Sequence, residues 1–99
     1  MSVIQRTRYN GGKREAIVAA AKKSKAIHEK AGAEAFRLGQ IHTGPHAGQW
    51  VVSTLYPDWE TYGKARQALA SNAAFQKLMA EVEAMSEVAD RVVIAGIDL

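Results

Sequence analysis

The sequence has three histidines, at positions 28, 42 and 46, and imidazole is the side chain that most often serves as a general base near neutral pH. His28 lies late in a segment expected to be helical, and it is the best candidate base, although a half-buried structural role would explain it as well. His42 and His46 are four residues apart, a spacing that converges on a metal only from a helix. Gly44 and Pro45 lie between them, so we expect a loop and no metal site.

Four large aromatic residues could shape a pocket for a planar apolar compound, although burial in the core would also account for them. They are Tyr9, Trp50, Trp59 and Tyr62. Gly63 follows two of them inside an expected helix, where glycine costs about 1 kcal/mol relative to alanine. This glycine indicates either a close approach of the helix to the sheet or room for a ligand. We therefore interpret the four aromatic residues as candidate ligand contacts.

The absence of cysteine removes disulfides, thiolate metal sites and cysteine nucleophiles from consideration. The sequence also has no G-x-S-x-G nucleophile elbow. We therefore expect neither a hydrolase nor a cofactor or metal centre. A reducing cytoplasm suits such a chain, because free thiols and disulfides play no part in it.

A length of 99 residues, with 47% hydrophobic and 23% charged residues, predicts one globular domain over residues 1–99. No apolar run approaches the roughly 18 residues of a membrane helix, so we expect no membrane insertion. Residues 1–40 hold nine Lys and Arg against three Glu. Because six of these basic residues fall in the expected first helix, a solvated helix face explains them better than a nucleic-acid surface.

Hydrophobic periodicity and turn residues divide the chain into six main elements. Strands are expected over residues 3–9, 34–42, 49–56 and 88–99, and helices over residues 13–31 and from residue 58 onward, with a break at Ser71 and Asn72. This order predicts a ferredoxin-like βαββαβ fold, of the α+β class, in which two helices cover one face of a four-stranded antiparallel sheet. Apolar side chains are expected on both faces of the sheet, which predicts a homodimer that covers the second face.

Arginines on the strands raise a separate question, because a charge that faces the interior requires a partner or an anionic ligand. We expect Arg8 to be exposed at a strand edge.

Several segments resemble the dimeric α/β-barrel superfamily, and the likeness extends over nearly the whole chain. Residues 56–63 and 70–76 are similar to its second helix, which breaks before a phenylalanine. Gly32-Ala33, Arg37-Leu38 and the Gly44–Gly48 turn are also similar. The resemblance implies a ligand pocket between sheet and helices. The superfamily includes cofactor-independent monooxygenases, haem-degrading enzymes, isomerases and stress-responsive proteins. Its haem enzymes use a histidine of the second helix, which residues 57–86 lack, so haem is disfavoured.

Two functions remain in competition. One is a small-molecule site with monooxygenase-like or isomerase-like activity on a planar apolar compound. The other is a non-catalytic, stress-responsive homodimer, which the lack of a convincing acid–base set favours. RNA binding is a weak third, because the expected strand over residues 49–56 lacks the paired aromatic residues that stack bases.

Overall fold

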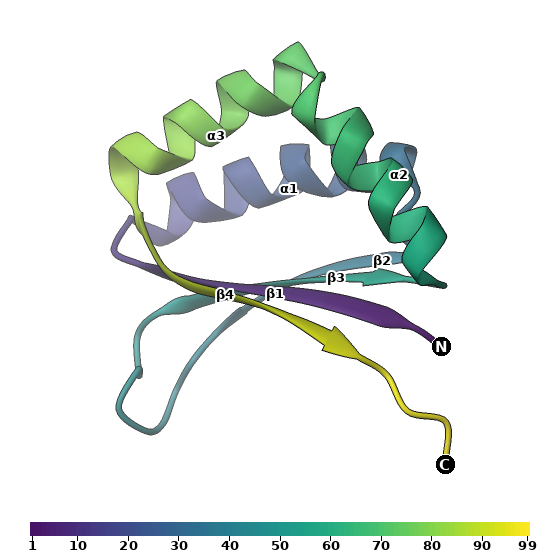
Figure 1. Ribbon diagram of the computed structural model, residues 1–99. Coiled ribbons are helices and arrows are strands. Elements are labelled where there is room, and N and C mark those ends of the chain that lie inside the picture. Colours follow the sequence, from purple (N-terminus) through teal and green to yellow (C-terminus); the bar gives the residue numbers. More distant parts are fainter.

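The computed structural model describes residues 1–99 as a single α+β domain (Figure 1). The expected elements are confirmed, with their bounds shifted by one to four residues. In chain order they are β1 (Val3–Asn10), α1 (Arg14–Ala31), β2 (Ala35–Gln40), β3 (Trp50–Tyr56), α2 (Trp59–Ala70), α3 (Ala73–Met85) and β4 (Glu87–Ala95).

The four strands form one antiparallel sheet in the order β2-β3-β1-β4. All three helices cover the same face, and the opposite face carries no element of this chain (Figure 1). The βαββαβ prediction is therefore correct, and its second helix is divided into α2 and α3.

Side-chain caps set the starts of both C-terminal helices. Asp58 accepts a hydrogen bond from the Thr61 amide at 2.7 Å, and Asn72 accepts one from the Phe75 amide at 2.9 Å. These bonds satisfy backbone donors that the first turn of a helix leaves free. The second cap explains why the expected break at residues 71–72 begins a new helix rather than merely bending the old one.

Strand register determines which residues face the helices. Along β1, Val3, Gln5 and Thr7 are buried on the inner face. Their partners on β3 are Tyr56, Thr54 and Val52. Strand residues alternate between the two faces, so Ile4, Arg6 and Arg8 lie on the outer face.

The pairing of β4 with β1 contains a β-bulge. Arg8 pairs with Asp90, but Tyr9 pairs with Val88, which leaves Ala89 without a partner. At its other end β4 stops at Ala95, the partner of Val3, rather than at Leu99 as expected. One further backbone hydrogen bond joins the two segments, from the Gly96 amide to the Ser2 carbonyl oxygen at 2.8 Å.

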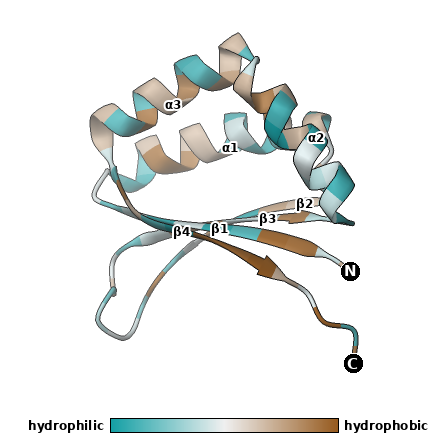
Figure 2. Cartoon of the chain, viewed as in Figure 1, coloured by the Kyte–Doolittle hydropathy of each residue, from teal (hydrophilic) through white to brown (hydrophobic).

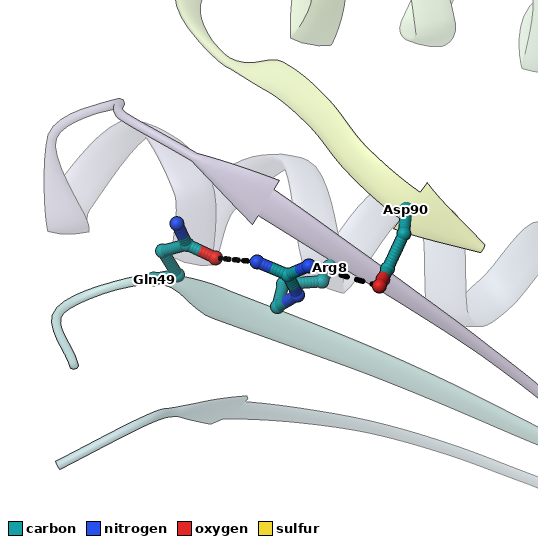
Figure 3. A network of polar contacts seen from close by, with 3 residues as sticks. All are labelled: Arg8, Gln49 and Asp90. Atoms are coloured by element: carbon teal, nitrogen blue, oxygen red, sulfur yellow. Dashed lines mark hydrogen bonds and ion pairs between the residues drawn. The ribbon is translucent and has the colours of Figure 1, made fainter. Parts of the chain in front are cut away.

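Arg8 corrects one expectation from the sequence. It lies on β1, an interior strand of the sheet, and its side chain is only 17% exposed. The guanidinium donates hydrogen bonds to Gln49 Oε1 at 2.5 Å and to Asp90 Oδ2 at 2.8 Å (Figure 3). The prediction of strand-edge exposure was wrong, and the partner that a shielded charge requires is Asp90. The hydrogen bond from Arg8 also lowers the pKa of the Asp90 carboxyl.

None of the three helices combines the length and apolar character needed to cross a bilayer.

Candidate ligand-binding cavity

A cavity of about 60 Å³ lies between the inner face of the sheet and the helices. Its walls are mainly apolar and come from every helix and strand, although α2 and β4 contribute only one residue each, Arg66 and Arg91. The apolar lining includes Ile17, Phe36, Trp50 and Phe75. The polar lining groups are few, so each can fix the orientation of a ligand.

His28 is the titratable residue of the cavity wall whose pKa is changed by its surroundings. It is 7% exposed, and its ring packs against Phe36 and Phe75 with ring centroids 5.1 and 5.3 Å away. Burial lowers its pKa, and the positive charge of Arg66 acts in the same direction, while the hydrogen bond to Ser24 opposes them. The imidazole is therefore neutral at neutral pH.

The tautomer of His28 follows from its hydrogen bonds. Nδ1 lies 2.7 Å from the Ser24 carbonyl oxygen, which can only accept, so Nδ1 carries the proton and donates it. The Ser24 hydroxyl lies 3.1 Å from the same nitrogen. Nε2 has no hydrogen-bond partner in the protein. It is also not fully buried, because every fully buried side-chain nitrogen or oxygen in the structure has a partner. It presents a free lone pair.

Gln5 supplies a polar group on the floor of the cavity. The Tyr62 hydroxyl donates to Gln5 Oε1 at 2.9 Å, which fixes the orientation of the amide. The amide nitrogen therefore keeps two hydrogens for a ligand oxygen.

The cavity adjoins a groove of about 170 Å³ beside α3 and β4. Six residues line both hollows: Tyr9, Arg66, Phe75, Met79, Val82 and Arg91. Arg91 Nε donates to Thr7 Oγ1 at 3.2 Å, which ties this arginine to the floor. The shared walls make the groove the natural mouth of the cavity.

The structure places three of the five predicted site residues on the cavity wall: His28, Tyr9 and Trp50. Trp59 and Tyr62 do not line it. Trp59 is 51% exposed and meets Tyr62 edge to face at 6.0 Å. Tyr62 in turn packs against Tyr56, behind Gln5. A direct role for Trp59 and Tyr62 in ligand binding stays a prediction from the sequence.

Gly63 is not explained by a close approach of helix and sheet. A Cβ atom added there would meet nothing within 4 Å, and the residue is exposed. It does not line the cavity either, so nothing in the structure explains this glycine.

Six polar lining residues escaped the sequence analysis: Gln5, Thr7, Ser24, Thr54, Arg66 and Arg91. Gln5 and Thr7 alternate with Ile4, Arg6 and Arg8, so both faces of β1 look mixed. The available signal was the two-residue spacing of Gln5, Thr7 and Tyr9, which puts all three on one face.

His42 and His46 are exposed in the loop between β2 and β3, as the turn residues around them predict.

The four-stranded antiparallel sheet with its three helices is a ferredoxin-like α+β fold, and several solved structures share it. The sequence profile of DUF6854, a domain of unknown function, matches residues 2–94, so the chain belongs to that family. No curated protein matches it in sequence.

Solved structures share the fold at low sequence identity. A variant of SnoaB, a cofactor-independent oxygenase from Streptomyces nogalater, is 15% identical with a TM-score of 0.77, over 99% of this chain and 95% of that one. HapK from Hahella chejuensis is 12% identical with a TM-score of 0.69, over 98% and 93%. A NIPSNAP family protein from Agrobacterium tumefaciens is 13% identical with a TM-score of 0.66, over 99% and 95%.

Proposed function

We propose that the protein binds a planar, largely apolar small molecule between sheet and helices, and that His28 removes a proton from it without a bound cofactor. One observation carries this proposal: a neutral imidazole, fixed by Ser24 through Nδ1, presents an unpartnered Nε2 on the wall of an apolar cavity. A neutral imidazole with a free lone pair is a competent general base.

The chemistry follows from this geometry. A C–H bond of the compound breaks, its proton joins Nε2, and the electron pair stays on the substrate as a carbanion. The Gln5 amide hydrogens stabilise negative charge that moves onto a conjugated oxygen. Return of the proton to another carbon completes an isomerisation. In the alternative, dioxygen oxidises a CH2 group to a carbonyl, with one oxygen atom kept in the product and the other released as water.

The oxygenase variant is supported by the likeness of the chain to SnoaB, which is described as a cofactor-independent oxygenase. At 15% identity this likeness concerns the fold. The reaction is therefore argued from His28 and the groups around it.

The size of the site favours a flat ligand that enters from the groove. A cavity of roughly 150 Å³ is enough for benzene, and the enclosed part here holds only about 60 Å³. The groove beside it adds about 170 Å³. A planar compound therefore fits with one edge near His28 and the remainder between Tyr9 and Met79, which line the shared walls.

The proposed assembly is a homodimer formed through the outer face of the sheet. That face carries Ile4, Val51, Leu55, Val92 and Ile94, and no element of this chain covers it. Hydrophobic residues are concentrated in the first part of β1 and the second half of β4 (Figure 2), the stretches that contribute Ile4, Val92 and Ile94 to this face. Burial of this apolar surface against a second copy would stabilise the pair.

A non-catalytic, stress-responsive homodimer is the second candidate. The observation that favours it is that His28 has no acidic partner: its polar contacts are both with Ser24. A base without a second proton-transfer group suits a binding site as well as a catalytic one.

Tryptophan fluorescence offers a direct test, because the chain has two tryptophans and only Trp50 lines the cavity. In Trp59→Phe, Trp50 is the sole reporter. Titration with naphthoquinones, flavins and aromatic polyketides should give saturable quenching by at least one compound. Ala21→Leu adds bulk to a cavity wall and should weaken the binding, whereas Ala19→Leu, at an exposed position of the same helix, should not. Absence of saturation with every compound would exclude the binding site.

Exchange of the bound compound's acidic C–H hydrogens with deuterated solvent separates the two candidate functions. The enzyme requires exchange that His28→Gln abolishes while binding persists. Binding without exchange in the unaltered protein would favour the non-catalytic alternative.

A further inference from the structure

We infer that the ligand of this cavity is a planar acid, bound as its anion, with the ionised oxygen held by Arg66 and Arg91. The inference rests on the proposed function, because it concerns the same cavity. It adds the chemical class of the ligand and assigns two residues that select it.

Arg66 reaches the cavity from α2 and is half-buried there. It makes no ion pair: the two in the structure are Arg8 with Asp90 and Lys64 with Glu60. It also donates no side-chain hydrogen bond to the protein, whereas a half-buried guanidinium has five donors to satisfy. Its charge acts on the interior: burial lowers the pKa of His28 and Arg66 adds to that effect, whereas burial raises the pKa of Tyr56 and Arg66 opposes it.

Arg91, an exposed residue of β4, lines both the cavity and the groove beside it. Its Nε donates to Thr7 Oγ1, and this bond leaves the terminal nitrogens of the guanidinium free. A guanidinium that is already held in place loses less side-chain entropy when it binds a carboxylate or an enolate oxygen.

The cavity lining contains no carboxylate that could neutralise these two cations. Arg66 and Arg91 are the only residues of the cavity wall that are charged at neutral pH. Glu83 lines the outer groove, but it is exposed and forms no ion pair. Two cations beside an apolar hollow repel each other and attract an anion, and the attraction is stronger there than in open water.

This arrangement also matches the orientation proposed above. An ionised oxygen at the shared walls would leave the apolar part of the ligand between the aromatic side chains, with its inner edge toward His28. The arginines then bind the substituent that distinguishes one planar compound from another, and His28 acts on the ring system that they position.

Lawsone and its methyl ether make a suitable pair of probes, because they share one naphthoquinone ring system and only lawsone is anionic at neutral pH. Both are titrated against Trp59→Phe with Trp50 as the reporter. We expect lawsone to bind at least about tenfold more tightly, in keeping with charge-assisted hydrogen bonds. Arg66→Gln and Arg91→Gln should each reduce that preference and leave binding of the ether unchanged. Added salt should weaken the binding of lawsone and leave the binding of the ether unchanged.

Glu83→Gln serves as the opposite control. Removal of the one carboxylate in the groove should strengthen lawsone binding and leave the ether unaffected. Thermal unfolding of each variant shows whether it is folded, and Arg91→Lys, which keeps the charge, should retain most of the preference if Arg91→Gln proves unstable. Equal affinity for the two probes would overturn this inference and leave the proposed function standing. Failure of both probes and of every neutral compound tested would overturn the proposed function as well.

Discussion

The imidazole of His28 donates from Nδ1 to the carbonyl oxygen of Ser24, one helical turn earlier, across 2.7 Å. This carbonyl belongs to the backbone of α1, so its position is fixed by the helix itself. Substitution of the Ser24 side chain would therefore leave the principal bond in place. The tautomer of His28 is therefore determined by a backbone carbonyl rather than by another side chain.

Burial of His28 predicts a pH dependence of stability. Its pKa in the folded protein lies below the ordinary value of 6.5, so between these two values the unfolded chain binds a proton that the folded chain does not. The contribution of His28 is thus complete above the unfolded pKa and is lost as the pH falls through the window below it. Denaturant unfolding should show a smaller loss of stability between pH ~7 and ~5 in His28→Gln than in the unaltered protein.

His42→Gln is the control for this experiment, because His42 lies in the exposed β2–β3 loop. It should keep the unaltered slope. A His28 titration by NMR with a midpoint at or above 6.5 would contradict the prediction.

The hydrogen bond that caps the N-terminus of α3 predicts a loss of stability when Asn72 is replaced. Asn72→Ala removes the acceptor of the Phe75 amide, which should cost about 1 kcal/mol of unfolding free energy and lower Tm by about 4–8 °C. Asn72→Asp keeps a side-chain oxygen and should retain most of the stability. If alanine and aspartate have the same effect, the cap does not stabilise the helix.

Substitution of Gly63 is predicted to raise stability rather than lower it. The position is helical and a Cβ there meets no atom within 4 Å, so Gly63→Ala should stabilise the protein by about 0.5–1 kcal/mol. Differential scanning calorimetry measures the change. A loss of stability would mean that the position is crowded in solution, and an interface between copies would be the first explanation to examine.

Two neighbouring valines of β4 test the proposed homodimer with a matched pair. Val92 and Val93 are 45% and 43% exposed, but Val92 pairs with Arg6 on the outer face and Val93 with Gln5 on the inner face. Val92→Glu should dissociate the dimer, because it places a charge in the apolar interface. Val93→Glu should leave association intact. Sedimentation velocity distinguishes the outcomes, and an unaltered protein that is already monomeric at micromolar concentration would refute the dimer.

Most of the fold was predictable from local signals. Asn10 with two glycines, the Thr43–Gly48 turn and the Pro57-Asp58 pair mark the ends of elements, and these marks agree with the structure. Such signals act within a few residues, so the sequence carries them directly. The sequence also predicted that Val92 and Ile94 lie on the opposite face from Val93, since strand alternation requires only the chain direction.

The site was harder to predict from the sequence, because it depends on how helices and strands pack against one another. Trp59 and Tyr62 are aromatic residues of the kind that line pockets, but the orientation of α2 places Tyr62 against Tyr56 and behind Gln5. Trp59 packs edge to face against Tyr62 and is half exposed. Arg66 lies one turn beyond Tyr62 in the same helix and does reach the cavity. The rotation of a helix about its axis is determined by tertiary packing, so it cannot be predicted from one sequence.

The bulge in β4 adds one residue to the strand at the mouth of the cavity. Val88 and Arg91 both line the groove although they are three residues apart, an odd separation that in a regular strand would direct them to opposite faces. The unpaired Ala89 brings them to one side. Deletion of Ala89 would leave Tyr9 opposite Val88 and would keep Val88 and Arg91 on the inner face, because they would then be two residues apart in a regular strand. The deletion would remove the local bend and added twist of the bulge, so the shape of the mouth would change while the side chains that line it would not.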